Sequence, residues 1–145
     1  MIALRRAIRS DLPLLDEMIR EFYRIDQHHY DEQFVAAALV PLLENDDFGE
    51  VLLFDTGYAV VTWAYSLESG GRHAVLDEFF VRTPGKGIGG QVIEEICARC
   101  AARGMPQVVL ETEKHNDLAR KFYVRHGFVA DDSTWFSRGG PAQRR

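Results

Sequence analysis

A run of glycines between two segments of different character places the strongest constraint on the fold. Residues 85–90 read Gly-Lys-Gly-Ile-Gly-Gly. They follow a stretch rich in strand-forming residues, 73–81, and open a stretch, 87–103, whose apolar residues recur every four positions. The short and nearly continuous apolar segment 107–111 comes next, as expected for a central strand. The sequence therefore predicts a strand–helix–strand unit with glycines at its first connection.

Glycines at such a connection leave the backbone amides accessible, because they adopt positive φ at little cost and carry no side chain. The first amides of the following helix have no partner within the helix, and the helix dipole favours an anion there. Lys86 adds a positive charge. A tight turn alone is the simpler alternative, but four glycines among six residues are more than a turn requires. We therefore expect a loop that binds a pyrophosphate.

Two nucleotide-binding motifs compete for this loop. A P-loop is excluded, because Lys86 is followed by glycine rather than serine or threonine. The dinucleotide fingerprint G-x-G-x-x-G is met by Gly85, Gly87 and Gly90, with Glu111 at about the distance of a ribose-binding acid. However, only 34 residues follow Glu111, too few to complete a doubly wound sheet. A fragment of a dinucleotide-binding oxidoreductase is thus the weakest alternative.

The rest of the chain supplies further strands and helices. The predicted elements are a short strand within 2–8, a helix with Ser10 as N-cap, a helix from Asp31 that Pro41 kinks or ends, a hairpin over 51–65, a helix from the cap Asn116 to His126, and a terminal strand region over 128–136. The length of 145 residues fits one domain. We predict one α/β (α+β) domain over residues 1–138, with a mixed central sheet and about four helices, and a polar tail over 139–145.

Three segments in the same order resemble the GNAT acetyltransferase superfamily. They are Val81–Gly90, Asn116–Ala119 and Phe122–Phe128. The family pattern is a strand ending near valine, a loop (Arg/Gln)-x-x-Gly-x-(Gly/Ala), a helix, a strand, and a second helix with Asn-x-x-Ala-x-x-Phe-Tyr-x-x-x-Gly-Phe. Pro84 departs from this pattern, since the family has Arg or Gln there, and the loop is about two residues short. The departure removes a side-chain contribution but leaves the backbone amides of the loop unchanged.

The resemblance implies that acetyl-CoA is the co-substrate and that the chain is an N-acetyltransferase acting by direct attack in a ternary complex. Phe80 and Val81 would pair through their backbone with the pantetheine amides, and Asn116 would contact the pantetheine arm. Arg82 is a candidate substitute for the missing Arg or Gln. The candidate coenzyme-binding residues are Phe80, Val81, Arg82, Gly85, Lys86, Gly87, Ile88, Gly89, Gly90 and Asn116.

The candidate catalytic residues are Tyr123, Asp77 and Glu78. Tyr123 resembles the family's general acid, and a phenol with a pKa near 10 is a suitable proton donor to a leaving thiolate. Asp77 and Glu78 are candidate bases, because burial beside aromatic residues raises the pKa of a carboxylate toward neutrality. Strand alternation sends the two acids to opposite faces, so at most one faces a given cleft. Similarity to polyamine-type members points to Asp77 and similarity to other members to Glu78, so both stay open.

A polar cluster near the predicted junction of the first two helices has two interpretations. Tyr23, Asp26, His28, His29 and Tyr30 either line the acceptor pocket or form a polar loop. Two adjacent histidines without a suitably spaced acid do not make a metal site, and we expect no metal. The pair Cys97 and Cys100 lies within the predicted helix 87–103, so we interpret both as ordinary helix residues.

Charge and hydropathy limit the classes of binding partner and the cellular location that the sequence favours. The net charge of -5 excludes a general basic surface for nucleic acid and mildly favours a small cationic amine. No apolar run reaches the length of about 18 residues that a membrane span needs, and residues 1–8 lack a signal-peptide core. We expect a cytoplasmic protein, with monomer and homodimer both open.

A polyamine, an aminoglycoside, an amino acid or a protein N-terminus would serve as acceptor. A non-catalytic acyl-CoA-binding or interaction module is the main alternative function.

Overall fold

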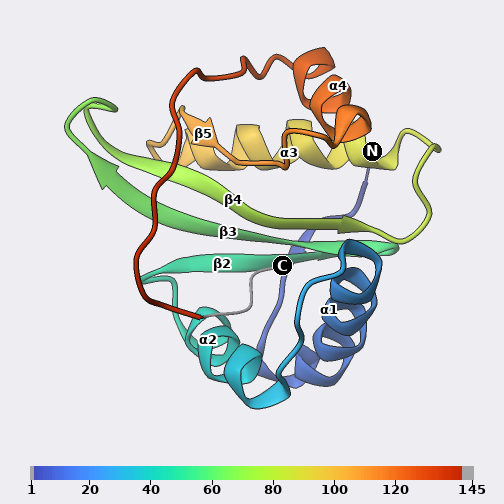
Figure 1. The fold of residues 1–145 in the computed structure, drawn as a ribbon. Coiled ribbons are helices and arrows are strands. Elements are labelled where there is room, and N and C mark those ends of the chain that lie inside the picture. Colours follow the sequence, from blue (N-terminus) through green and yellow to red (C-terminus); the bar gives the residue numbers. More distant parts are fainter. Residues whose placement is uncertain (1, 142–145) are drawn as a thin grey trace.

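The computed structural model describes residues 2–141, within which five strands form one mixed sheet in the order β1-β2-β3-β4-β5 (Figure 1). The strands are β1 Arg5–Arg6, β2 Gly49–Phe54, β3 Gly57–Ser66, β4 Gly71–Val81 and β5 Val108–Val109. Neighbouring strands from β1 to β4 are antiparallel, whereas β5 is parallel to β4. The parallel pair is the strand–helix–strand unit predicted around the glycines.

Four α-helices cover the two faces of this sheet within the described residues (Figure 1). Helices α1 (Leu12–Asp26) and α2 (Glu32–Glu44) lie on one face, and α3 (Ile88–Ala102) and α4 (Asp117–Arg125) lie on the other. Each face has its own apolar core, to which alternate residues of β3 contribute. The predicted architecture, a mixed sheet with about four helices, is confirmed.

Two helix boundaries differ from the prediction. Pro41 lies inside α2, which continues to Glu44, because the following Leu42 and Leu43 are buried in the core and hold the last turn in place. Ser10 is not the cap of α1, since it lies in a short 3-10 helix, Arg9–Asp11, that precedes it. Tertiary packing thus overrides a local helix-breaking signal.

The predicted terminal strand over 128–136 is wrong. No strand is assigned to these residues, and the chain after α4 runs along the outside of the molecule (Figure 1). Val129, Trp135 and Phe136 are each more than four-fifths exposed. Strand-forming residues become a strand only where a neighbouring edge pairs with them, and this segment has no assigned strand partner. Of the predicted tail 139–145, residues 142–145 lie outside the described residues.

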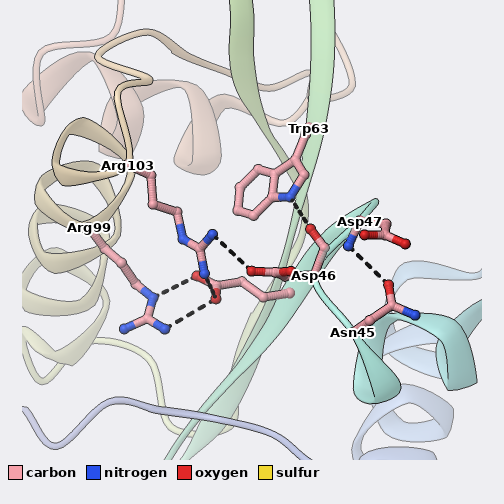
Figure 2. A network of polar contacts seen from close by, with 7 residues as sticks. Asn45, Asp46, Asp47, Trp63, Arg99 and Arg103 are labelled. Carbon is pink, nitrogen blue, oxygen red and sulfur yellow. Dashed lines mark hydrogen bonds and ion pairs between the residues drawn. The ribbon is translucent and has the colours of Figure 1, made fainter.

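A buried glutamate anchors the C-terminal half of α3 to the sheet (Figure 2). Glu50 of β2 is 1% exposed, and its carboxylate accepts two hydrogen bonds from Arg99, at 2.6 and 3.1 Å, and one from Arg103, at 3.1 Å. The Arg103 guanidinium also lies 5.1 Å from the ring centre of Trp63, whose Nε1 donates to the Asp46 carbonyl oxygen at 2.8 Å. No local pattern predicts this network, because its members come from separate elements that meet only in the folded chain.

None of the helices in the described part of the chain combines the length and the apolar character that crossing a membrane requires.

Candidate active site

The outer edge of β4 is open along half its length. β4 pairs with β5 only at Ala74 with Val108 and at Val75 with Val109. Beyond Val75 the strand continues to Val81 with no partner strand on that side among the described residues. Backbone N–H and C=O groups at such an edge are available to a ligand with amide groups.

A β-bulge interrupts the alternation of β4 at the two candidate bases. Glu78 pairs with Val60 and Leu76 with Val61, so Asp77 is the extra residue of the bulge. Leu76 and Phe79 both join the core beneath α3, whereas Glu78 contacts residues on the α1 side. Strict alternation therefore does not hold across the bulge, since Leu76 and Glu78, two residues apart, contribute to opposite faces of the sheet.

Glu78 and Asp77 differ in their surroundings. Glu78 is half-buried, and its carboxylate accepts hydrogen bonds from the hydroxyls of Tyr58, at 2.7 Å, and Tyr23. Burial raises the pKa of Glu78 above its usual value of 4.5, and the two phenol hydrogen bonds oppose that shift. Asp77 is exposed. Only Glu78 combines partial burial with a raised pKa, which is the combination that suits a general base near neutral pH.

The polar cluster between α1 and α2 is partly organised around this carboxylate. Tyr23 reaches Glu78 from the second half of α1, and its ring centre lies 5.7 Å from His28 and 6.0 Å from Tyr30. His28 pairs with Asp26 at 2.9 Å. The Tyr30 hydroxyl donates to Asp16, and His29 is exposed. The cluster therefore adjoins Glu78 through Tyr23.

The four glycines of the turn divide into two pairs with different tasks. Gly85 and Gly87 have φ of +89° and +77°, and Gly87 is the N-cap of α3. In contrast, a Cβ on Gly89 would lie 3.4 Å from the Phe122 ring, and one on Gly90 would lie 2.8 Å from His126. The first pair shapes the turn, and the second lies where α4 packs on α3: Gly90 leaves room for His126, whereas a Cβ on Gly89 would be in ordinary van der Waals contact with Phe122. The amides of residues 88–90 have no acceptor within the helix.

Replacing Gly87 by alanine is expected to weaken coenzyme binding, because an L-residue at this φ costs about 1–2 kcal/mol and shifts the amides beside it. Gly104→Ala is the matched control, since Gly104 lies at the other end of α3, with φ of +86° and equally open space around its missing Cβ. Both variants should lose similar stability, but only Gly87→Ala should bind acetyl-CoA about tenfold more weakly in calorimetry. Equal affinities for the two variants would contradict the role of the turn.

The positively charged side chains near the loop have different environments. The Arg82 guanidinium donates to Glu21 at 2.9 Å and to Glu17 at 3.0 Å, both on α1. Lys86 is exposed in the loop, beside Pro84. Arg82 is thus engaged with α1, and an incoming anion would meet mainly backbone amides and Lys86.

The predicted general acid, Tyr123, lies on α4, and Asn116 lies at the start of the same helix. Asn116 caps α4, because its side-chain oxygen accepts a hydrogen bond from the Ala119 N–H at 3.2 Å. Tyr123 packs edge-on against Phe122 and Phe128, with ring centres 5.2 and 5.5 Å away. Burial raises the pKa of Tyr123 to about 12. The phenol therefore carries its proton at neutral pH, as a general acid must.

The two cysteines lie in α3, Cys97 half-buried and Cys100 buried in the core, and both are free thiols. Burial raises the pKa of each, that of Cys100 to about 11, so neither is activated as a nucleophile. Among the described residues, no group of histidines, cysteines and acids is arranged to hold a metal ion.

Comparison with protein families gives a match that covers most of the chain. The model of the acetyltransferase (GNAT) family matches residues 12–128. None of the curated proteins matches the sequence significantly.

Solved structures share the fold over nearly the whole chain. An integron cassette protein from the mobile metagenome of Cole Harbour Salt Marsh is 27% identical, with a TM-score of 0.83, and the match covers 95% of this chain and 91% of that one. A protein from Arthrobacter sp. FB24 described as an acetyltransferase is 25% identical, with a TM-score of 0.81 over 94% and 95% of the two chains. An aminoglycoside acetyltransferase from an uncultured soil metagenomic sample is 20% identical, with a TM-score of 0.75 over 97% and 96%, and shows likeness of fold.

Proposed function

The chain belongs to the GNAT acetyltransferase family, and on that basis we propose that it transfers the acetyl group of acetyl-CoA to the primary amine of a small molecule by direct attack. The observation that carries this proposal is the open edge of β4 leading to the glycine-capped start of α3. Such an edge suits the amides of a pantetheine arm, and free helix amides suit a pyrophosphate.

Three groups of residues would hold the coenzyme. The amides of residues 88–90 would bind the pyrophosphate, with Lys86 adding charge. The backbone of Phe80 and Val81 would pair with the pantetheine, and Asn116 would contact it. Bound acetyl-CoA supplies the thioester carbonyl that the amine attacks.

Proton transfer would be divided between Glu78 and Tyr123. The amine nitrogen forms a bond to the acetyl carbon, and the bond from that carbon to sulfur breaks. Glu78 accepts the proton that the amine loses, directly or through a water molecule, and the Tyr123 hydroxyl donates a proton to the departing thiolate. We favour Glu78 over Asp77 as the base because only Glu78 is half-buried, with its pKa raised. Holding amine and thioester in register would supply a large part of the rate.

A small cationic amine is the acceptor class that we favour. The Glu78 carboxylate contacts the hydroxyls of Tyr23 and Tyr58, Asp77 is the preceding residue and is exposed, and the net charge is -5. One structure with the same fold is that of an aminoglycoside acetyltransferase. Rings and carboxylates together attract an ammonium group.

Calorimetry with acetyl-CoA and an assay of thiol release test the proposal. We expect acetyl-CoA to bind at micromolar strength and NADH not to bind. A panel of polyamines, aminoglycosides, amino acids and amino-terminal peptides should include an amine that releases free coenzyme thiol. Binding without release for every amine would favour the non-catalytic acyl-CoA-binding module instead.

Replacing Tyr123 by phenylalanine is expected to lower kcat by about 10²-fold or more, because general acid catalysis contributes that much. The ring packing against Phe122 and Phe128 would stay, so the affinity for acetyl-CoA in calorimetry should not change. An unchanged kcat would show that the thiolate leaves without help from this phenol.

A further inference from the structure

Both oxygens of the Glu78 carboxylate are held by tyrosines from different elements. Tyr58 of β3 donates to Oε1 at 2.7 Å, and Tyr23 of α1 donates to Oε2. A carboxylate bonded at both oxygens cannot rotate without losing a hydrogen bond. The pairing of β3 with β4 brings Tyr58 close to Glu78, and the packing of α1 on the sheet brings Tyr23 to the same carboxylate.

The aromatic core fixes the positions of the two hydroxyls. The Tyr58 side chain is fully buried, with its ring centre 6.3 Å from that of Phe22 and 6.1 Å from that of Phe80. The Tyr23 ring is half-buried, 6.0 Å from Phe22. Because these rings are held by their neighbours, the hydrogen bonds to Glu78 need little further ordering.

The electrostatic surroundings of Glu78 act in opposite directions. Burial and the nearby charge of Asp77, on its own strand, raise the pKa of Glu78, whereas the hydrogen bonds from Tyr23 and Tyr58 and the proximity of His28, after α1, lower it. Burial and the carboxylate together raise the pKa of Tyr58, so this phenol remains a donor. The two tyrosines therefore stabilise the charged form of a carboxylate that burial destabilises.

We propose that Tyr23 and Tyr58 are positioning residues that fix the Glu78 carboxylate and set the pH above which it can accept a proton from the amine. This inference rests on the proposed function, in which Glu78 is the base. Neither tyrosine exchanges a proton with substrate. Tyr58 holds Oε1 from β3, and Tyr23 holds Oε2 from α1, next to the polar cluster.

The test compares Tyr23→Phe and Tyr58→Phe with Tyr30→Phe as the matched control. Tyr30 also donates to a carboxylate, and its ring lies 6.0 Å from that of Tyr23, but its hydrogen bond is to Asp16 rather than to Glu78. Each of the first two variants should move the acidic limb of the kcat/KM profile upward by about one pH unit, because the charged form of Glu78 loses a hydrogen bond. In Tyr30→Phe the limb should stay at the wild-type pH.

A second measurement does not depend on activity. Carbon-13 NMR of protein labelled at glutamate carboxyl groups follows the titration of Glu78, whose signal is identified by its absence in Glu78→Gln. The midpoint should rise in Tyr23→Phe and in Tyr58→Phe. If Tyr58→Phe fails to fold, the Glu78 titration midpoint in Tyr23→Phe alone tests the inference.

Two outcomes would overturn the inference: a Glu78 midpoint that stays unchanged in the folded variants, or an equal shift in Tyr30→Phe. Failure of the proposed function has a different signature. In that case the wild type acetylates no amine at any pH, while the NMR titration still reports on the two tyrosines.

Discussion

Replacing Glu78 by glutamine is expected to lower kcat/KM for amine acetylation by about 10²–10⁴-fold, the range that a general base contributes. The amide keeps the shape of the side chain and still contacts the hydroxyls of Tyr23 and Tyr58, but it cannot take up a proton. Steady-state kinetics over a range of pH measure this loss. Because the pKa of Glu78 is raised, the acidic limb of the wild-type profile should lie above the range of an ordinary glutamate.

The same substitution should not destabilise the fold at neutral pH. The folded protein keeps the proton on Glu78 to a higher pH than the unfolded chain does, because burial raises its pKa above 4.5. The resulting cost is absent below that usual pKa and reaches its full size above the raised pKa. The free energy of unfolding of Glu78→Gln, measured with urea, should therefore increase relative to that of the wild type between acidic pH and pH 7.

Asp77→Asn provides the comparison, since it makes the same chemical change one residue away at an exposed position. We expect its loss of kcat/KM to be much smaller than that of Glu78→Gln. The reverse order would identify Asp77 as the base and overturn the assignment of Glu78.

Replacing Glu50 by alanine is expected to destabilise the protein by about 3 kcal/mol, because removing one partner of a buried ion pair leaves the others without compensation. Three hydrogen bonds from Arg99 and Arg103 would be lost at a side chain that is 1% exposed. The two arginine side chains are about one-third exposed and can turn toward water, which keeps the effect at the lower end of the range. Thermal unfolding should show a decrease in Tm on the order of 10 °C.

Glu44→Ala is the matched control for this loss. Glu44 pairs with Arg9 at 2.6 Å, but both side chains are about half exposed or more. An exposed pair of this kind contributes about 1 kcal/mol or less. Equal losses in the two variants would show that burial does not govern the contribution of Glu50.

Much of the fold could be predicted because its signals are local. The glycine turn after a strand-forming stretch, the cap at Asn116 and the hairpin over 51–65 each depend on a few neighbouring residues, and the structure confirms all three. The order of these signals, with the segment up to Phe128, also indicated the family that the comparisons show. Backbone conformation near a glycine or a cap is set by residues within one turn, so the sequence alone was sufficient.

Other features depended on contacts between distant segments. The segment 128–136 has strand-forming residues but no assigned strand partner, and Pro41 stays helical because Leu42 and Leu43 are buried. The bulge at Asp77 comes from the register between β3 and β4, which no single strand specifies. Burial and pairing are properties of the folded chain, and they overrode the local signals at these positions.

The sequence by itself determined the strand–glycine–helix unit, the candidate residues and the family, because these follow from short-range patterns. Only the tertiary structure distinguished Glu78 from Asp77, brought Tyr23 and Tyr58 to its carboxylate and buried Glu50 against α3. The physical reason is the same in each case. The pKa and the orientation of a side chain depend on which groups lie around it, and the chain brings those groups together only by folding.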